Sequence, residues 1–291
     1  MTRSLLVLAL LGVLLAGCGE SITDACTIDT KRCQGTKLTK SIASQAEKYR
    51  RGIGVEKDLA KAFELYQIAH DRGLNGAEYR LAEAYRKGEG TERNPAMALQ
   101  LYGESADAGN IGAVYRMAEM YRIGDGIEKD PEKAVQLYQR AVAVGNIGAT
   151  YRLADSYRTG IGIEKDPVKA AQLYQRAAQS GHAGAQYRLA EAYRTGEGIA
   201  KDPVKADQLY RKTAETGHIR GQYMLAVSYR TNEDYVMAYK WFSLAGSRAP
   251  AGKIQDLALA SRDNIARRMT DGEIREAEVL ARQWMPKTSP L

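Results

Sequence analysis

A repeat with a period of 36 residues constrains the fold of this chain more than any other feature. Its units begin at Ser41, Ala77, Ala113, Ala149, Ala185 and Gly221. The first unit follows the plan loosely, and the last has lost four residues around Asn232 and Glu233. A period of this length is typical of solenoids, because one unit cannot bury its apolar face alone and must stack on its neighbours. Positions are numbered below from the start of each unit.

Each unit is predicted to form two helices. In the unit from Ala149, apolar residues at positions one, five, six and nine share one helical face. Gly160 and Gly162 end that helix and allow a tight turn. Asp166 and Pro167 start the second helix, because aspartate accepts from free amides and proline fits the first helical position. Gly181 is a candidate residue for ending it.

The repeat pattern reads A-x-Y-x-L-A-x-x-Y-x-x-G-x-G-I-x-K-D-x-x-K-A-x-x-L-Y-x-x-A-A-x-x-G. It resembles the Sel1-like repeat, a relative of the tetratricopeptide repeat, and covers residues 41–246. The resemblance implies an all-α fold, a right-handed α-solenoid of stacked helix-turn-helix units. Residues 247–291 are expected to form capping helices and a tail, in which Thr270 and Glu273 make a capping box.

Residues 1–17 predict a lipoprotein signal peptide. Arg3 precedes an apolar run over residues 5–15, which is shorter than the roughly 20 residues that a membrane span needs. The run leads into Leu-Ala-Gly-Cys, ending at Cys18, which resembles the bacterial lipobox and implies acylation of Cys18. An ordinary signal peptide that carries a cysteine is the alternative. The lipidated chain is expected in the cell envelope, anchored in a bilayer and, in a Gram-negative organism, in the outer membrane facing the periplasm.

Residues 18–40 are predicted to be the lipidated cysteine and a polar tether, because apolar residues at helical spacing are lacking. Cys26 and Cys33 are the only other cysteines. In an oxidising compartment a local disulfide between them is expected, and free thiols are the alternative.

The net charge of +7 would suit an anionic partner, but export makes nucleic acid an unexpected one. No catalytic residues, metal or cofactor are predicted. Only three histidines are present, and His182 and His218 hold the same repeat position, where they are expected to be surface turn residues rather than metal ligands. The Gly-x-Gly turns lack the ending of a phosphate-binding loop.

Side chains at fixed positions of the first helix are the functional candidates. The predicted partner-binding residues are Tyr79, Tyr115, Tyr151, Tyr187 and Tyr223 at position three, Glu83, Glu119, Asp155 and Glu191 at position seven, and Arg86, Arg122, Arg158, Arg194 and Arg230 at position ten. Arg80, Arg116, Arg152 and Arg188 stand at position four. Arginine, acid and arginine are three residues apart, so pairing along each helix is expected.

Positions three, seven and ten match those that line the concave groove of tetratricopeptide repeats when Leu-Ala-x-x-Tyr is aligned with Leu-Gly-x-x-Tyr of that family, so the resemblance implies a groove lined by these side chains. Tyrosine and arginine are also enriched at binding hot spots. Two alternatives remain open: the charged ladder is a solvated face, and the tyrosines pack between repeats.

These patterns favour a membrane-anchored envelope scaffold that binds another envelope protein. The resemblance implies a role in exopolysaccharide export, envelope signalling or host contact. A module that binds an anionic polysaccharide is the alternative. A β-lactamase-like enzyme is weaker still, because the members of this family linked to β-lactams carry a disulfide in nearly every repeat, and these repeats contain no cysteine.

Overall fold

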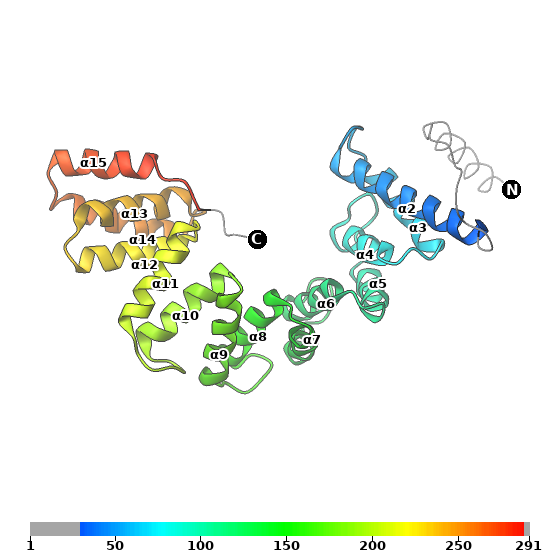
Figure 1. The fold of residues 1–291 in the computed structure, drawn as a ribbon, viewed down its shortest axis with the longest axis horizontal. Helices are drawn as coiled ribbons and strands as arrows, with labels where there is room; N and C mark the ends of the chain where they lie inside the picture. Colours follow the sequence, from blue (N-terminus) through cyan, green and yellow to red (C-terminus); the bar gives the residue numbers. More distant parts are fainter. Residues whose placement is uncertain (1–29, 288–291) are drawn as a thin grey trace. The chain divides into compact units, whose positions relative to one another are not determined.

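The computed structural model describes residues 30–287 (Figure 1). Within that range it contains fourteen helices and no strand, which confirms the all-α expectation. The helices are α2 (Thr30–Arg51), α3 (Leu59–Asp71), α4 (Ala77–Lys87), α5 (Pro95–Asp107), α6 (Ile111–Ile123), α7 (Pro131–Ala143), α8 (Ile147–Thr159), α9 (Pro167–Gln179), α10 (Ala183–Thr195), α11 (Pro203–Glu215), α12 (Ile219–Thr231), α13 (Tyr235–Arg248), α14 (Lys253–Ala266) and α15 (Asp271–Arg282). None of the described helices is both long enough and apolar enough to span a bilayer.

The described residues divide into two compact units, the first ending at Ala77 and the second beginning at Glu78. In the first, α2 packs on α3, and the Tyr66 hydroxyl donates a 2.7 Å hydrogen bond to Glu47. Because α2 begins at Thr30, residues 30–40 of the predicted tether are helical. A helix extends past its apolar face because each added residue gains a hydrogen bond without a new nucleus. The predicted lipidation at Cys18 and disulfide between Cys26 and Cys33 lie outside the described residues and side chains.

The second unit contains the repeats from Ala77 onward as helix pairs. From α5 to α13 each helix packs on the next one in chain order, and α14 and α15 both pack on α13 (Figure 1). This stacking of neighbours confirms the predicted solenoid. The two C-terminal helices follow the last repeat as expected, and Thr270 and Glu273 form the predicted capping box.

Short sequence signals set the helix ends. The side chain of Asp166 accepts from the Lys169 amide, and Pro167 is the first helical residue of α9. Gly160 closes α8 with a φ of 76°, in the left-handed region. Gly162, also at positive φ, lies so close to the Pro131 carbonyl of the preceding repeat that a Cβ there would overlap it. This second glycine of the turn therefore fits one repeat onto the one before it.

Alanines and tyrosines fill the core between helices. Tyr102, Tyr138 and Tyr174 are buried, although each carries a hydroxyl group that needs a partner. The C-terminal end is more apolar: Phe242, Trp241 and Leu225 form a cluster with Ile265 of α14 and Ala277 of α15. The repeats thus differ from the C-terminal end in how polar their interior is.

Candidate functional site

The carboxylate at position seven is the point at which three kinds of side chain meet. Glu119 on α6 accepts from the hydroxyl of Tyr138 on α7. It also accepts from Arg122 on its own helix, at 3.1 Å to Nε and 2.8 Å to Nη2. Arg152 on α8 reaches back from the next repeat and donates from Nη2 at 3.1 Å. One carboxylate therefore ties together both helices of its repeat and the first helix of the following one.

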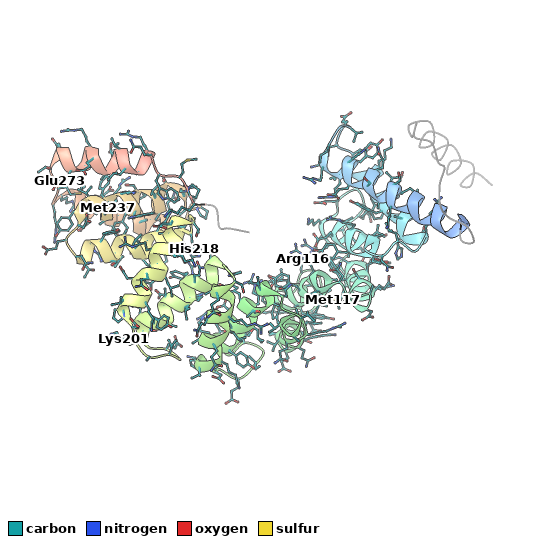
Figure 2. The ribbon with its side chains drawn as sticks, in the orientation of Figure 1. Arg116, Met117, Lys201, His218, Met237 and Glu273 are labelled. Carbon is teal, nitrogen blue, oxygen red and sulfur yellow. The ribbon has the colours of Figure 1, made fainter. Side chains whose placement is uncertain are left out.

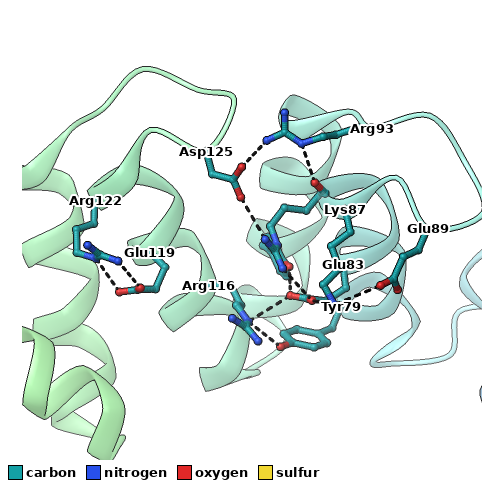
Figure 3. A network of polar contacts seen from close by, with 11 residues as sticks. Tyr79, Glu83, Lys87, Glu89, Arg93, Arg116, Glu119, Arg122 and Asp125 are labelled. Atoms are coloured by element: carbon teal, nitrogen blue, oxygen red, sulfur yellow. Dashed lines mark hydrogen bonds and ion pairs between the residues drawn. The ribbon is translucent and has the colours of Figure 1, made fainter. Parts of the chain in front are cut away.

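The arrangement recurs along the second unit. Glu83 accepts from the Tyr102 hydroxyl and pairs with Arg86 at 3.3 Å and with Arg116 of the next repeat at 3.2 Å (Figure 3). We call the groups around Glu83, Glu119, Asp155 and Glu191 the carboxylate clusters.

In the third cluster, Asp155 accepts from Tyr174 at 2.6 Å and pairs with Arg158 at 3.1 Å and with Arg188 at 3.6 Å. Glu191 accepts from Tyr210 and pairs with Arg194 at 2.9 Å. No arginine of the next repeat is within reach of it, because position four there is Met224.

The predicted pairing of the charged ladder is correct for position ten and wrong for position four. Arg86, Arg122, Arg158 and Arg194 pair with the acid one helical turn earlier, as expected. Arg116, Arg152 and Arg188 pair with the acid of the preceding repeat. Stacking places position four of one repeat against position seven of the repeat before it. The position-four arginines therefore form ion pairs that join neighbouring repeats.

The tyrosines at position three are half-buried and pack between helices. Tyr79, Tyr115, Tyr151, Tyr187 and Tyr223 each contact an aromatic ring of the second helix of their repeat, with ring centroids 5.4 to 6.1 Å apart. Arg116 Nε also donates to the Tyr79 hydroxyl at 3.3 Å (Figure 3). Packing between the two helices of each repeat accounts for these rings, and a role in partner binding stays a prediction.

The clusters carry fixed charges at neutral pH. Burial opposes ionisation of Glu83, but the Tyr102 hydrogen bond and the neighbouring Lys87, Arg86 and Arg116 outweigh it and lower its pKa to about 2. The pKa values of the other three acids are lowered for corresponding reasons. Burial first, and then the carboxylate beside it, raises the pKa of Tyr102. The acids thus stay ionised and the tyrosine stays a donor.

Arg230 differs from the other position-ten arginines. It is exposed, and no ion-pair partner for it is found among the described residues. In this last repeat position seven is Val227, and Phe242 stands where the earlier repeats have the buried tyrosine. The carboxylate clusters therefore stop at Glu191.

The histidines at the repeat boundaries are helix caps. The Nδ1 atoms of His182 and His218 accept from the Ala185 and Gly221 amides at 3.1 Å, at the starts of α10 and α12. His218 is labelled in Figure 2. Burial, and then the charge of Arg152, lowers the pKa of His182. The sequence held a signal for this role, because Asn146 occupies the same repeat position and caps α8 in the same way. No group of three potential ligands in the described part of the chain is arranged to hold a metal ion.

Comparison with known proteins shows which family the repeats match. The model of the Sel1 repeat matches residues 46–74, 76–110, 111–146, 147–182, 183–218 and 219–249. A Sel1 repeat protein from Oxalobacter formigenes is 30% identical with a TM-score of 0.67, over 72% of this chain and 88% of that one. A protective antigen of uropathogenic Escherichia coli strains is 25% identical with a TM-score of 0.56, over 84% of this chain.

This chain spans 60% of the length of that antigen. Comparison with curated proteins gives no match. The family model indicates no catalytic family. Because its matches extend over more than half of the sequence and follow the helix pairs of the structure, the chain belongs to the Sel1 repeat family.

Proposed function

We propose that this protein is a lipid-anchored scaffold of the cell envelope, which binds another envelope protein through the first helices of its repeats. Sel1 repeats mediate interactions between proteins, so the family supports the scaffold part of the proposal. The Leu-Ala-Gly-Cys tetrad ending at Cys18 supports the anchor. Exopolysaccharide export, envelope signalling and host contact are the settings in which we expect such a scaffold to act.

The observation that carries the proposal is the excess of arginine around the carboxylate clusters. Seven arginines surround four carboxylates: Arg86, Arg116, Arg122, Arg152, Arg158, Arg188 and Arg194. Their guanidinium groups remain partly accessible, with side-chain exposures of 42% for Arg116 and 48% for Arg194. A guanidinium that is already held in place loses less freedom on binding, so these groups form a preorganised positive surface.

The test uses in-cell cross-linking of the full-length protein, followed by identification of the captured proteins. The variant replaces Arg116, Arg194 and Arg230 with Gln, because these side chains are the more exposed members of the ladder. Glu83 keeps Arg86 as a partner, and Glu191 keeps the Tyr210 hydroxyl. A control variant with the same charge change replaces Arg267, Arg275 and Arg282, which are exposed near the C-terminus. We expect a defined envelope protein to be captured by the wild type and the control and lost from the ladder variant.

Equal capture by both variants, at unchanged melting temperatures, would contradict binding through the first helices. Cys18→Ser tests the anchor separately, since it is expected to move the protein from the membrane fraction to the soluble envelope fraction.

An anionic polysaccharide is the second candidate, because the same arginine excess would attract it. Its binding is expected to weaken steeply with salt. A protein partner is favoured because Asp125 and Glu197 interrupt the positive surface, whereas a polyanion needs an unbroken track.

A further inference from the structure

The junctions between repeats differ at position 13, which lies between the two glycines of the turn. The residues there are Glu89, Asp125, Ile161 and Glu197. Asp125 belongs to the repeat from Ala113, and its carboxylate reaches back to two cations of the repeat before it. It accepts from Arg86 Nη1 at 3.2 Å and from Arg93 Nη2 (Figure 3). The chain thus supplies its own counter-charge at this junction.

The junction between the repeats from Ala149 and Ala185 holds a cavity of about 180 Å³, but an acid, Glu197, is part of its lining together with Arg158 and Arg188. Glu197 lies 3.4 Å from the Nζ atom of Lys165, which occupies the same repeat position as Arg93. An acid at position 13 therefore neutralises the cation at position 17 of the preceding repeat in both cases.

The junction between the repeats from Ala113 and Ala149, which lies between the two junctions just described, lacks such an acid. Ile161 takes the place of Asp125, and Arg122 and Lys129 are the equivalents of Arg86 and Arg93. Lys129 has no ion-pair partner in the part of the chain that the structure describes. A cavity of about 190 Å³ opens here, lined by Arg122, Lys129, Arg152, Arg158, Asp155 and Ile161 among others.

The charge of this cavity is positive. Four cations line it, and the carboxylates of Glu119 and Asp155 account for two of those charges through the clusters around them. The Ser156 hydroxyl is a further lining group that can donate, whereas the Thr159 hydroxyl already donates to the Asp155 carbonyl at 2.8 Å. Ile161, which is 53% exposed, forms an apolar wall beside the charges.

We infer that this cavity binds a carboxylate side chain of a protein partner, in the place that Asp125 occupies at the preceding junction. The inference rests on the proposed scaffold function and names the chemistry that the partner presents. A guanidinium and an ammonium group hold a carboxylate through charge-assisted hydrogen bonds, and the apolar wall fits an aliphatic residue next to that acid. The acids at both neighbouring junctions favour a single carboxylate over a continuous polyanion.

The decisive variant is Ile161→Asp, which supplies the carboxylate from within the chain and copies Asp125. Its counterpart is Asp125→Ile, which opens an equivalent cavity one repeat earlier. Both are single changes at a turn position that already tolerates either residue in this chain, and circular dichroism and melting temperature check the fold. The probe is an array of short peptides, each containing one Glu next to a Leu in an otherwise neutral sequence, with Gln versions as controls.

We expect the full-length protein, in detergent, to bind a subset of the Glu peptides and not their Gln versions. Ile161→Asp is expected to weaken that binding about tenfold, since a charge-assisted hydrogen bond to the peptide is lost. Asp125→Ile is expected to add a second site of similar affinity. Lys129→Gln should weaken binding of the same peptides that Ile161→Asp affects.

Unchanged binding of the Glu peptides by folded Ile161→Asp would overturn the inference and leave the scaffold proposal standing. No Glu-dependent binding by the wild type would also overturn it, and the cross-linking experiment would then decide the scaffold proposal independently. If a uronate oligosaccharide binds instead, with the same loss in Ile161→Asp, the occupant is a sugar and the choice of a protein partner is wrong.

Discussion

The repeat from Ala113 and the repeat from Gly221 solve the same packing problem in opposite ways. In the first, Glu119 and Tyr138 face each other, and Arg122 and Arg152 complete a polar cluster. In the last repeat the equivalent pair is Val227 and Phe242, which belong to an apolar cluster with α14 and α15. A half-buried carboxylate is stable only when cations and donors surround it, and part of that shell comes from the next repeat.

An intermediate case supports this reading. The Glu191 side chain, which lacks an arginine from the following repeat, is 26% exposed, against 17% for Glu119, 11% for Glu83 and 23% for the shorter Asp155. Solvent therefore has more access to the Glu191 carboxylate than to those of Glu119 and Glu83. The last repeat has no successor of its kind, and its apolar pair instead provides a surface for the C-terminal helices to cover.

Acid is expected to separate the two regions most strongly. The lowered pKa of Glu83, about 2 in the folded chain, means that its stabilising effect is complete above its ordinary pKa and lost as the pH falls towards 2. This group alone corresponds to about 3 kcal/mol, and the other clusters add to it. Hydrogen exchange at pH 3 and pH 6 should show α4 to α11 losing protection before α12 to α15. Earlier loss in the C-terminal helices would contradict the comparison.

Removing one carboxylate at neutral pH should have the next largest effect. Glu119→Val leaves Arg122, Arg152 and the Tyr138 hydroxyl without their partner, and we expect a loss of about 3 kcal/mol in unfolding free energy. Glu191→Val strands only one arginine and should cost about half as much. Urea denaturation of both variants measures the difference. An equal cost would show that the cation from the next repeat contributes nothing.

The reverse exchange tests the apolar repeat. Phe242→Tyr buries a hydroxyl group beside Val227 and should cost about 2 kcal/mol, because the group has no acceptor there. Adding Val227→Glu should restore part of the loss, since Arg230 lies at position ten and is free to pair with the new acid. A double-mutant cycle measures the coupling. If the loss of unfolding free energy in the double variant equals the sum of the two single losses, the new acid and the new hydroxyl do not interact, and the carboxylate cluster cannot be rebuilt in this repeat.

The smallest expected effect concerns the histidine caps. His182 has a lowered pKa and accepts through Nδ1, so its cap is complete above about pH 6.5 and lost as the pH falls through the lowered value. His182→Asn, which copies Asn146, should leave stability at pH 8 nearly unchanged and remove about 1 kcal/mol of its decline towards pH 5. Thermal unfolding across that range is the measurement, and identical pH profiles would contradict the cap.

Much of the fold could be predicted because each helix carries its own signals. The Asp166 and Pro167 pair starts α9, and Gly160 ends α8, as their residue types predict. Spacing along one helix reports only neighbours on that helix, so it assigned Arg152 to the wrong acid. Its true partner, Glu119, becomes visible only once the repeats are stacked.

The residue types of the candidate site could be predicted from the repeat, but the contacts between neighbouring repeats could not. Alignment of the repeats that begin at Ala77, Ala113, Ala149 and Ala185 shows that position 13 is acidic in three of them and is Ile161 in the fourth. The structure is needed to show that an acid at this position pairs with cations of the preceding repeat, as Asp125 does with Arg86 and Arg93.

The fit of Gly162 against Pro131 limits how such a chain can change its length. One residue inserted before this glycine would move it off the proline and bring a Cβ-bearing neighbour into a space that has no room for one. Deletions in the turn are tolerated at the terminal repeat, where four residues are missing. Gain or loss of whole 36-residue repeats keeps this fit, and a cavity like the one at Ile161 is then gained or lost together with its repeat.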